Sequence, residues 1–496
     1  MEIYLYSMAD QIDYMNYFSE EEIERMDIHP ELDRVSAPDM NGIRRDLDFG
    51  AYDSRGPNFD SDDAYRLGIA YGDMIQGMYV VGRDHRTDSK DIEDALIQGL
   101  NEQGVKVLDV GLAPTDMVSY IVQSSSADAG AIATASHMPP DYHGIKPLNA
   151  EGRIFDASEL DMAMENFLGN QVSRPAYIEA DKESSGEFHD DYIDAVVSRY
   201  YEIFEEDLKG VSIGVDPGHG MAATTVPEVL EKLGLNQGKD FFLVNDELDP
   251  EFPDRNPDPT EENLQDLSNL VLEQGLDLGV ALDGDADRVV YINEKGEKVS
   301  GDESLAILGE KYLETVKDNA AASISANSSA LVQEHINAAG GVIDYEPVGA
   351  VFPAKTSLKD KSPKTVFGGQ PNGHYLDPEF TPYDSGTLFS TIMPGIIKEK
   401  NQKLSELQEK LPKYIVQRKN IPTENKEQLV KELNKGLDKN LLTENGVIKG
   451  LKNGQVITMR PSGTEPVVRL TVETPNPNKT IKDLKNGKQS MEMFKN

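Results

Sequence analysis

The strongest chemical signal in the sequence is a run of three carboxylates at alternate positions, Asp283, Asp285 and Asp287. The small residues between them let the backbone curl so that the three side chains converge. Such a concentration of negative charge favours a hard cation among the oxygens, and Mg²⁺ is the natural candidate. An EF-hand is the alternative, because Glu294 is twelfth counting from Asp283, but Arg288 stands sixth, where that loop needs glycine.

A second polar loop, residues 134–147, combines a hydroxyl, two imidazoles and an ammonium group. Ser136 is a candidate covalent nucleophile or phosphate carrier. His137 and Lys146 are close enough in sequence to transfer protons or to stabilise charge there. A Ser-His pair before two prolines is also typical of an ordinary turn, so this loop gains meaning only beside the others.

Two further loops suit a phosphorylated sugar. The first begins at Arg460 and offers donors from Ser462, Gly463 and Thr464, and Arg469 follows in the next predicted strand. Two guanidinium groups and short donors around a glycine make a phosphate cradle.

The other loop is glycine-rich and contains Gln370, Asn372 and His374. Amide groups both donate and accept, which suits vicinal sugar hydroxyls, and the imidazole can reach a hydroxyl or a phosphate.

One segment points to different chemistry. Residues 218–223 approach the dinucleotide fingerprint GxGxxA, which would indicate an NAD-dependent dehydrogenase. The acidic residue that this fingerprint expects about 20 positions later has only Asp246 as a candidate, slightly late. This alternative leaves the other loops unexplained.

All of these loops follow short apolar runs that alternate with amphipathic stretches, the pattern of βαβ units with mostly parallel sheets. We therefore predict an α/β fold. The predicted strands are residues 78–84, 105–111, 130–136, 211–217, 276–283, 289–293 and 365–369, and two predicted helices are residues 92–103 and 225–233.

Composition excludes several functions. The chain has 496 residues, no cysteine and a formal net charge of −40, so thiol chemistry is absent and polyanionic nucleic acids or membrane surfaces are poor partners. No long apolar run or signal-peptide pattern occurs, and we predict a cytoplasmic protein. The acidity also suggests a surface suited to concentrated salt.

The charge changes sign near the C-terminus. Residues 391–496 hold 20 Lys and Arg against 12 Asp and Glu, whereas the rest holds 28 against 76. This shift predicts a separate C-terminal domain, with the lysine-rich run 398–439 as its entry helix and linker. The first 40 or so residues have no clear period or motif, and we expect a surface extension there.

Taken in order, these loops resemble those of the α-D-phosphohexomutase family, as do Arg55 within residues 51–56 and the Gly82-Arg83-Asp84 run. The resemblance covers the chain from about residue 45. It implies four domains around a central cleft: three related α/β domains with mixed sheets and a C-terminal α+β domain with an antiparallel sheet. We predict an extension at residues 1–43 and domains at 44–190, 191–299, 300–400 and 401–496, which contribute the serine, metal, sugar and phosphate loops respectively.

The resemblance implies a phosphohexomutase that interconverts hexose 1-phosphates and hexose 6-phosphates of mannose or glucose. The reaction would pass through a phosphoserine at Ser136 and a bisphosphate intermediate, with a hexose 1,6-bisphosphate as activator. A phosphoglucosamine mutase and a non-catalytic sugar-phosphate-binding paralogue are the alternatives. The implied groups are catalytic residues Ser136, His137, Lys146, Arg55 and Arg288; ligands for one Mg²⁺ from Ser136, Asp283, Asp285 and Asp287; and substrate-binding residues Gln370, Asn372, His374, Arg460, Ser462, Gly463, Thr464 and Arg469.

Several positions depart from the family's pattern. Met138 stands where the serine loop commonly has Asn, and Gln370 stands where the sugar loop usually has Glu. Ala350 and Val351 replace a histidine that some members have. The expected partners are small sugar phosphates, with a monomer or homodimer as the predicted assembly.

Overall fold

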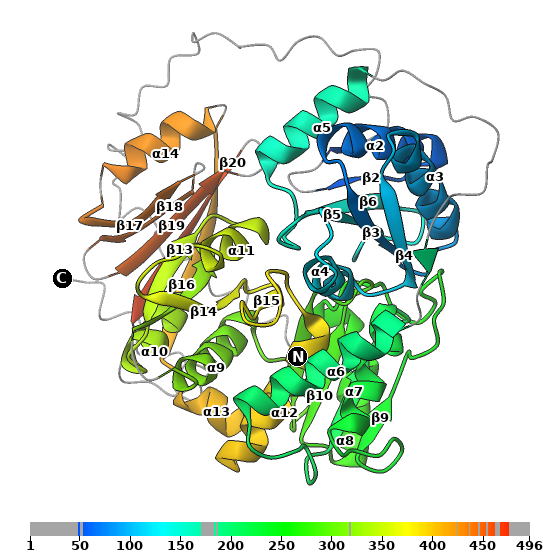
Figure 1. Ribbon diagram of the computed structural model, residues 1–496. Coiled ribbons are helices and arrows are strands. Elements are labelled where there is room, and N and C mark those ends of the chain that lie inside the picture. Colours follow the sequence, from blue (N-terminus) through cyan, green and yellow to red (C-terminus); the bar gives the residue numbers. More distant parts are fainter. Residues whose placement is uncertain are drawn as a thin grey trace. The chain divides into compact units, whose positions relative to one another are not determined.

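A computed structural model gives the fold of the chain (Figure 1). It describes residues 48–49, 53–169, 183–184, 187–316, 319–423, 425–435, 437–444, 447–452, 455–461 and 467–475. The predicted N-terminal extension lies outside these residues. The chain forms two compact units that divide between Ile415 and Val416. The larger contains three α/β domains, and the smaller contains an antiparallel sheet.

A mixed seven-stranded sheet forms domain I (Figure 1). In spatial order its strands are β1 (Asp48–Phe49), β2 (Ser54–Gly56), β6 (His143–Asn149), β5 (Ala129–Ala133), β3 (Met78–Arg83), β4 (Lys106–Leu112) and β7 (Glu183–Ser184). Its helices are α2 (Ser61–Met74), α3 (Ser89–Glu102), α4 (Thr115–Ser124) and α5 (Ala157–Gly169). Strand alternation buries both faces: Tyr79 and Val81 join the core under α2 and α3, whereas Val80 joins the core under α4.

Domain II repeats this architecture around a four-stranded sheet. In chain order its elements are α6 (Glu187–Ile203), β8 (Ile213–Asp216), η3 (Met221–Thr224), α7 (Val226–Lys232), β9 (Phe241–Leu243), η4 (Glu261–Asn263), α8 (Gln265–Gln274), β10 (Leu278–Leu282) and β11 (Val289–Asn293). The predicted helices at 92–103 and 225–233 appear as α3 and α7. Each is followed by a glycine with positive φ, Gly104 or Gly234, which ends the helix without steric cost.

Domain III has a third sheet of four strands. Its elements are α9 (Gly301–Glu314), β12 (Ala320–Ser325), α10 (Ala330–Ala338), β13 (Val342–Glu346), α11 (Val351–Ser357), β14 (Lys364–Gly369), β15 (Tyr375–Leu376), α12 (Gly386–Lys400) and α13 (Leu404–Lys410). A capping box between Ser300 and Glu303 fixes the start of α9, because each residue satisfies the backbone of the other.

The three domains share one connection order. In each domain the first strand pairs in parallel with both the second and the third strand, and the fourth strand pairs antiparallel with the third. From first to fourth, these strands are β3, β4, β5 and β6 in domain I, β8, β9, β10 and β11 in domain II, and β12, β13, β14 and β15 in domain III. Each predicted site loop of the larger unit connects the third strand to the fourth, at residues 134–142, 283–288 and 370–374. The related α/β domains predicted from the sequence are therefore confirmed.

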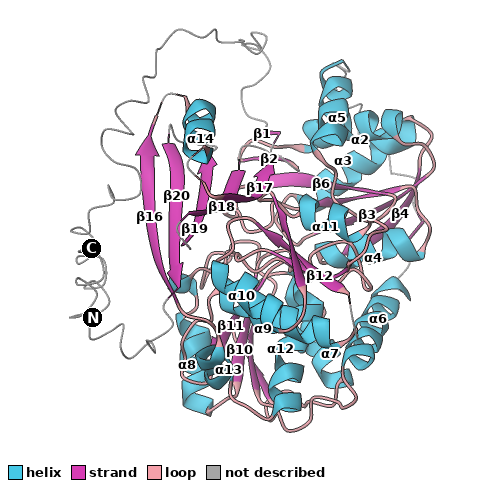
Figure 2. Ribbon diagram, turned by 90° about the vertical axis from the view of Figure 1, so that its left-hand side faces the viewer, coloured by secondary structure: helices cyan, strands magenta, loops and turns pink. Residues whose placement is uncertain are grey.

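The smaller unit holds a five-stranded sheet in the order β16 (Tyr414–Pro422), β20 (Val467–Pro475), β19 (Gln455–Pro461), β18 (Val447–Lys452) and β17 (Lys439–Glu444), with helix α14 (Lys426–Asn434). Figure 2 shows β16, β20 and β19 running side by side. Leu429 and Val430 of α14 pack on Ile457 and Val472 of the sheet. The prediction of an entry helix and linker over residues 398–439 is wrong: this run contains the end of α12, α13, strand β16 and α14.

Each of the seven predicted strands appears, with ends that shift by up to three residues. The largest shift is informative: β5 ends at Ala133, whereas the predicted strand ran to Ser136. Ser136 has a φ of 55° and so cannot continue a strand. Among the residues the structure describes, no helix is both long and apolar enough to cross a bilayer.

Candidate functional site

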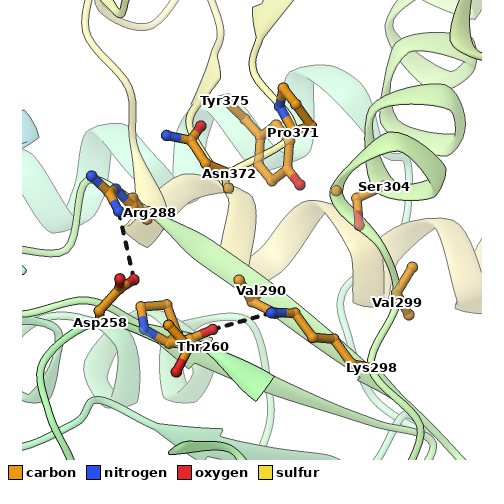
Figure 3. Close-up of a pocket in the computed structure, with 13 residues that line it drawn as sticks. Asp258, Thr260, Arg288, Val290, Lys298, Val299, Ser304, Pro371, Asn372 and Tyr375 are labelled. Atoms are coloured by element: carbon orange, nitrogen blue, oxygen red, sulfur yellow. Dashed lines mark hydrogen bonds and ion pairs between the residues drawn. The ribbon is translucent and has the colours of Figure 1, made fainter. Parts of the chain in front are cut away.

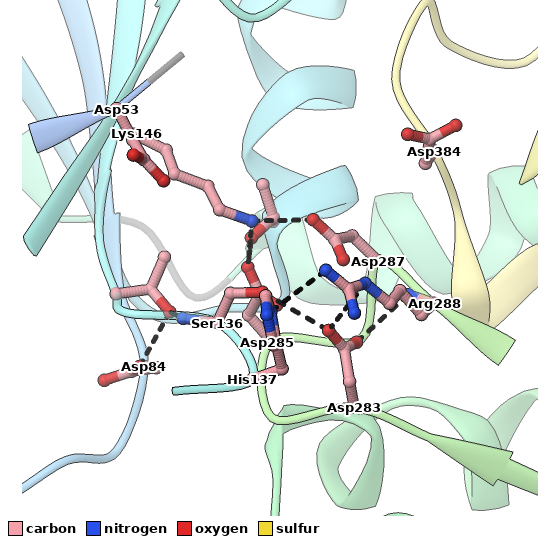
Figure 4. A network of polar contacts seen from close by, with 12 residues as sticks. Asp53, Asp84, Ser136, His137, Lys146, Asp283, Asp285, Asp287, Arg288 and Asp384 are labelled. Carbon is pink, nitrogen blue, oxygen red and sulfur yellow. Dashed lines mark hydrogen bonds and ion pairs between the residues drawn. The ribbon is translucent and has the colours of Figure 1, made fainter. Parts of the chain in front are cut away.

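Ser136 lies in the first residues after β5 and is almost fully buried, with 2% of its surface exposed. Its Oγ is 3.2 Å from His137 Nδ1 and donates to Asp283 Oδ2 at 3.3 Å. The structure therefore brings the serine loop of domain I to the carboxylate loop of domain II (Figure 4). The hydroxyl of Ser136 thus contacts a carboxylate that lies 147 residues away in the sequence.

Asp283, Asp285 and Asp287 converge as their spacing predicts. One oxygen from each lies within 4.8 Å of the others, and all three side chains are buried. Asp285 Oδ1 and Asp287 Oδ1 have no hydrogen-bond partner in the described structure. Ala286 takes a left-handed φ of 61°, which turns the loop between the carboxylates. Strand β11 follows this loop, so the helix that an EF-hand requires is replaced by a strand.

The electrostatics of this cluster fit a hard cation. Burial and the neighbouring carboxylates Asp287 and Asp285 raise the pKa of Asp283 well above its usual range. Burial also opposes ionisation of Asp287, but Lys146, His374 and Arg288 outweigh it and lower the pKa of Asp287. Buried oxygens that lack donors and repel one another are the ligands that Mg²⁺ selects.

Lys146 on β6 contacts two of the three carboxylates. Its Nζ donates to Asp285 Oδ2 and to Asp287 Oδ2, both at 2.6 Å. Burial alone would lower the pKa of Lys146, but the two carboxylates reverse the effect and raise it well above its usual value. The ammonium group therefore stays charged in this arrangement and offsets part of the negative charge of the cluster.

Arg288 connects histidines from two other domains, His137 of domain I, which Figure 4 shows beside it, and His374 of domain III. Its Nη2 is 3.0 Å from His137 Nδ1, and its Nε donates to His374 Nε2 at 3.0 Å. Because arginine can only donate, both imidazole nitrogens must be unprotonated acceptors. The proton of His374 is therefore on Nδ1, which lies 3.1 Å from Asp384 Oδ2.

His137 is kept neutral by its surroundings. Burial, followed by the charges of Arg288 and Arg55, lowers the pKa of His137 to about 2. Arg55 itself pairs with Asp53, with Nε 3.3 Å from Oδ2, and lies on β2 beside β6. Burial raises the pKa of Asp53. Arg55 thus lies close enough to His137 for its charge to affect that imidazole, and His137 is an uncharged hydrogen-bonding group beside Ser136.

All three α/β domains hold the backbone of the carboxylate loop. The carbonyl of Asp285 accepts from Thr115 N of domain I at 3.1 Å, and that of Gly284 accepts from Met221 N of domain II at 2.9 Å. The carbonyl of Ala286 accepts from Gly386 N of domain III at 2.9 Å. Thr115 Oγ1 also donates to Asp285 Oδ2 at 2.6 Å. Sequence reasoning missed these three hydrogen-bond donors, because they are distant in sequence from the aspartates and no motif marks them.

The sugar loop is organised around Gln370, whose side chain is buried. Its Oε1 accepts from Gly349 N at 3.2 Å, and its backbone N–H donates to His374 O at 2.9 Å. Asn372 is exposed at the tip of the loop. His374 contacts Arg288 and Asp384, so the residue predicted to bind substrate also holds a neighbouring arginine in place.

A pocket of about 240 Å³ adjoins this loop (Figure 3). It lies between domains II and III, and its wall includes Asn372, Arg288 and Lys298. Arg288 pairs with Asp258 across it at 3.6 Å. Burial lowers the pKa of Lys298. Sequence reasoning missed Asp258 and Lys298, which come from loops without a recognisable motif.

In the smaller unit, Arg460 on β19 and Arg469 on β20 are cross-strand partners. Burial, followed by the charge of Arg469, lowers the pKa of Arg460. Like charges at opposed positions of a sheet repel, and a bound anion would relieve that repulsion. The other predicted phosphate-loop residues, Ser462, Gly463 and Thr464, lie outside the described residues.

The glycines of segment 218–223 are needed for close packing. A Cβ at Gly218 would lie 2.3 Å from Arg255, and one at Gly220 would lie 2.7 Å from the carbonyl of Gly284. The segment therefore packs tightly on the carboxylate loop, which removes the observation that favoured a dehydrogenase.

Comparison with known proteins identifies relatives over nearly the whole described chain. Four family models match: phosphoglucomutase/phosphomannomutase alpha/beta/alpha domains I, II and III at residues 46–171, 190–296 and 300–414, and the phosphoglucomutase/phosphomannomutase C-terminal domain at residues 419–487.

Two relatives and one solved structure illustrate the similarity. The chain is 34% identical to a probable phosphoglucosamine mutase of Methanopyrus kandleri, over 83% of this chain and 89% of that protein. It is 30% identical to a phosphoglucomutase/phosphomannomutase of Thermococcus kodakarensis, over 90% and 98%. A crystal structure of a phosphoglucomutase/phosphomannomutase family protein from Burkholderia thailandensis has the same fold, with a TM-score of 0.74 at 22% identity, over 86% of this chain and 93% of that one.

Proposed function

The chain belongs to the phosphoglucomutase/phosphomannomutase family, and on that premise we propose that it is a Mg²⁺-dependent phosphohexomutase. It interconverts hexose 1-phosphates and hexose 6-phosphates through a phosphoserine at Ser136. The observation that carries this proposal is the approach of Ser136 Oγ to Asp283, within a buried cluster of three carboxylates.

Ser136 acts as the phosphate carrier. Its phosphoryl group passes to the free hydroxyl of a hexose monophosphate, so that the bond from phosphorus to Ser136 Oγ breaks as the bond to the sugar oxygen forms. The sugar hydroxyl gives its proton to an oxygen of the transferring phosphoryl group, while His137 beside the Oγ stays neutral and acts as a hydrogen-bonding group. The resulting bisphosphate then returns its other phosphoryl group to Ser136 and leaves the isomeric monophosphate.

The carboxylate cluster suits the cation that this chemistry requires. Asp283, Asp285, Asp287 and an oxygen on Ser136 would hold one Mg²⁺, which neutralises charge on the phosphoryl oxygens when bound. Lys146, Arg55 and Arg288 add positive charge around the same oxygens, and fixed charges of this kind are worth most in a buried site.

Substrate choice rests on the sugar loop and on the smaller unit. Gln370 and Asn372 would contact sugar hydroxyls, with His374 beside them. Arg460 and Arg469 would hold the phosphate that is not reacting, together with Ser462, Gly463 and Thr464. Mannose and glucose phosphates are the proposed substrates, with glucosamine phosphate as the alternative. A hexose 1,6-bisphosphate would serve as the activator.

The proposed domains follow the family matches, with the boundary between domains III and IV at Ile415, where the chain divides into its two compact units. Small sugar phosphates as partners, a monomeric or homodimeric state and a cytoplasmic location remain predictions from the sequence.

A phosphorus NMR time course tests the activity. The purified chain is incubated with Mg²⁺, a trace of glucose 1,6-bisphosphate and, separately, the 1-phosphates of mannose, glucose and glucosamine, with a pentose 1-phosphate as a smaller-ring control. We expect a 6-phosphate resonance with at least one hexose and none in the Ser136→Ala variant. Conversion of no hexose at low or high salt would instead favour the sugar-phosphate-binding paralogue.

A further inference from the structure

Two buried pairs of arginine and aspartate lie just outside the reacting groups, at matching places in domains I and II. Asp84 directly follows β3, and Asp216 ends β8; these are the first strands of the two equivalent sheets. Their partners, Arg86 and Arg255, are 2% and 5% exposed. Each arginine extends toward the loop that follows the third strand of its own sheet.

Arg86 uses all five of its side-chain N–H groups. Nε donates to Asp84 Oδ2 at 3.1 Å, which neutralises the buried charge. The other four bind backbone carbonyls of the serine loop: Ser136 at 2.8 Å, Met138 at 2.7 Å, Pro139 at 2.6 Å and Tyr142 at 3.1 Å. No lysine could replace this pattern, because an ammonium group has only three donors.

The same pair holds the other side of Ser136. Asp84 Oδ2 accepts from Thr134 Oγ1 at 2.8 Å, and that hydroxyl accepts from Ser136 N at 2.9 Å (Figure 4). Both the N–H and the carbonyl of Ser136 therefore depend on Asp84 and Arg86. The left-handed φ of Ser136 is unfavourable for a non-glycine residue, and such a conformation persists only where the surroundings enforce it.

Arg255 is the counterpart in domain II. Its Nε donates to Asp216 Oδ2 at 2.9 Å, and its Nη2 donates to the carbonyl of Leu282 at 2.7 Å. Leu282 directly precedes the first carboxylate of the metal loop, so this hydrogen bond fixes the point at which the loop leaves β10.

We infer that the two Asp–Arg pairs are one positioning device, present twice: Asp84–Arg86 sets the orientation of the phosphate-carrying Ser136, and Asp216–Arg255 sets the carboxylates that bind the metal. Arg86 and Arg255 are positioning residues, because they act through loop carbonyls. The inference rests on the proposed function for its account of Ser136. This role of Arg86 also explains how Met138 can differ from the family's usual residue, because Arg86 donates a hydrogen bond to the backbone carbonyl of Met138 and not to its side chain.

The test separates the two pairs by their readouts. Arg86→Met and Arg255→Met are compared with the parent chain and with Arg153→Met, a control that removes another buried arginine of domain I, paired with Glu159. Affinity for Mn²⁺ is measured by electron paramagnetic resonance on the metal alone. Phosphorylation of Ser136 by glucose 1,6-bisphosphate is followed by intact mass, and thermal melting checks folding.

We expect Arg255→Met to weaken Mn²⁺ binding about tenfold, the usual effect of losing support behind metal ligands, and its phosphorylation rate to recover at high Mg²⁺. We expect Arg86→Met to weaken Mn²⁺ binding less than Arg255→Met does, because Ser136 supplies only one of the four proposed ligands, but to slow phosphorylation about a hundredfold at any Mg²⁺ concentration. Identical behaviour of the two variants, or equal losses in Arg153→Met, would overturn the inference.

Glutamine variants at both positions decide the question if the methionine variants fail to fold, since glutamine keeps two donors. If the parent chain itself accepts no phosphoryl group, the proposed function fails, while the Mn²⁺ measurement still tests the pair at Arg255.

Discussion

At the scale of single residues, Gln370 is the departure with the clearest chemical meaning. Its Oε1 accepts from the backbone of Gly349, a contact that a glutamate oxygen would also make. The amide Nε2 is therefore the group that distinguishes this chain from the family's usual glutamate. An amide donates to a sugar oxygen, whereas a carboxylate attracts an amino sugar.

We predict that Gln370→Glu changes the ranking of substrates more than it changes the dependence on Mg²⁺. Activity with glucosamine 1-phosphate should rise relative to mannose 1-phosphate, because the introduced anion faces a cationic amine. The measurement is kcat/KM for each sugar together with a Mg²⁺ titration. Gln265→Glu, at an exposed helix position, adds the same charge as a control. A change in Mg²⁺ affinity alone would mean that Gln370 does not contact the sugar.

At the scale of elements, the serine and metal loops approach each other closely. A Cβ at Gly284 would lie 2.7 Å from the carbonyl of Ser136, closer than real contacts allow. That carbonyl is also bound by Arg86, so it has little freedom to move. The glycine thus sets the separation of the loops that carry the serine and the carboxylates.

Gly284→Ala should therefore slow phosphoryl transfer while the chain still folds. Overpacking at such a contact typically costs about 1–3 kcal/mol of stability, and a small displacement of reacting groups can cost about a hundredfold in rate. Single-turnover phosphorylation of Ser136 measures the effect. Gly169→Ala, where an added Cβ meets no atom within 4 Å, is the matched control. Unchanged rates in Gly284→Ala would mean that the loops separate freely.

The sequence predicts the parts of this site that are local. Three aspartates at alternate positions after an apolar strand indicate a metal loop, and the structure brings them together. The contacts that hold the loops are not local: Thr115 binds Asp285, 170 residues away, and Arg86 binds Ser136, 50 residues away. The Arg86 contact forms only within the folded sheet of domain I, and the Thr115 contact only when domains I and II pack together, so no short window of sequence contains either pair.

At the scale of the whole molecule, Asp116 joins the three α/β domains. It lies in the first turn of α4 and accepts from Tyr192 Oη of α6 at 2.7 Å and from Ser385 Oγ at the start of α12. Burial outweighs these donors and raises the pKa of Asp116 to about 7. The joint between the domains therefore contains a carboxyl group that keeps its proton far above the pH at which an exposed aspartate loses it.

The raised pKa of Asp116 predicts a pH-dependent stability. The unfolded chain releases the Asp116 proton near pH 4, but the folded chain holds it until about pH 7, so the folded state loses stability as pH rises between these values. A tenfold difference in proton affinity between the two states corresponds to about 1.4 kcal/mol. The Tm of Asp116→Asn, which cannot titrate, should therefore rise relative to the parent from pH 5 to pH 8. A constant difference in Tm across that range would contradict the assignment.

The charge of the whole chain predicts a salt dependence. With a formal net charge of −40, repulsion between surface carboxylates opposes the compact state at low ionic strength. Salt at about 1 M shortens the screening length to about 3 Å, so Tm and activity should both increase with added salt. Full activity and an unchanged Tm at low ionic strength would remove the case for a salt-adapted surface.

The most direct test of the central claim is the covalent state of Ser136. The dephosphorylated chain is mixed with Mg²⁺ and glucose 1,6-bisphosphate, and its intact mass is recorded beside those of Ser136→Ala and Ser126→Ala. Ser126 is an exposed serine of the same domain with a similar φ of 56°. We predict a gain of one phosphoryl group in the parent and in Ser126→Ala, and none in Ser136→Ala. A parent chain that gains no mass, or a Ser136→Ala variant that still does, would contradict a phosphoserine mechanism at Ser136.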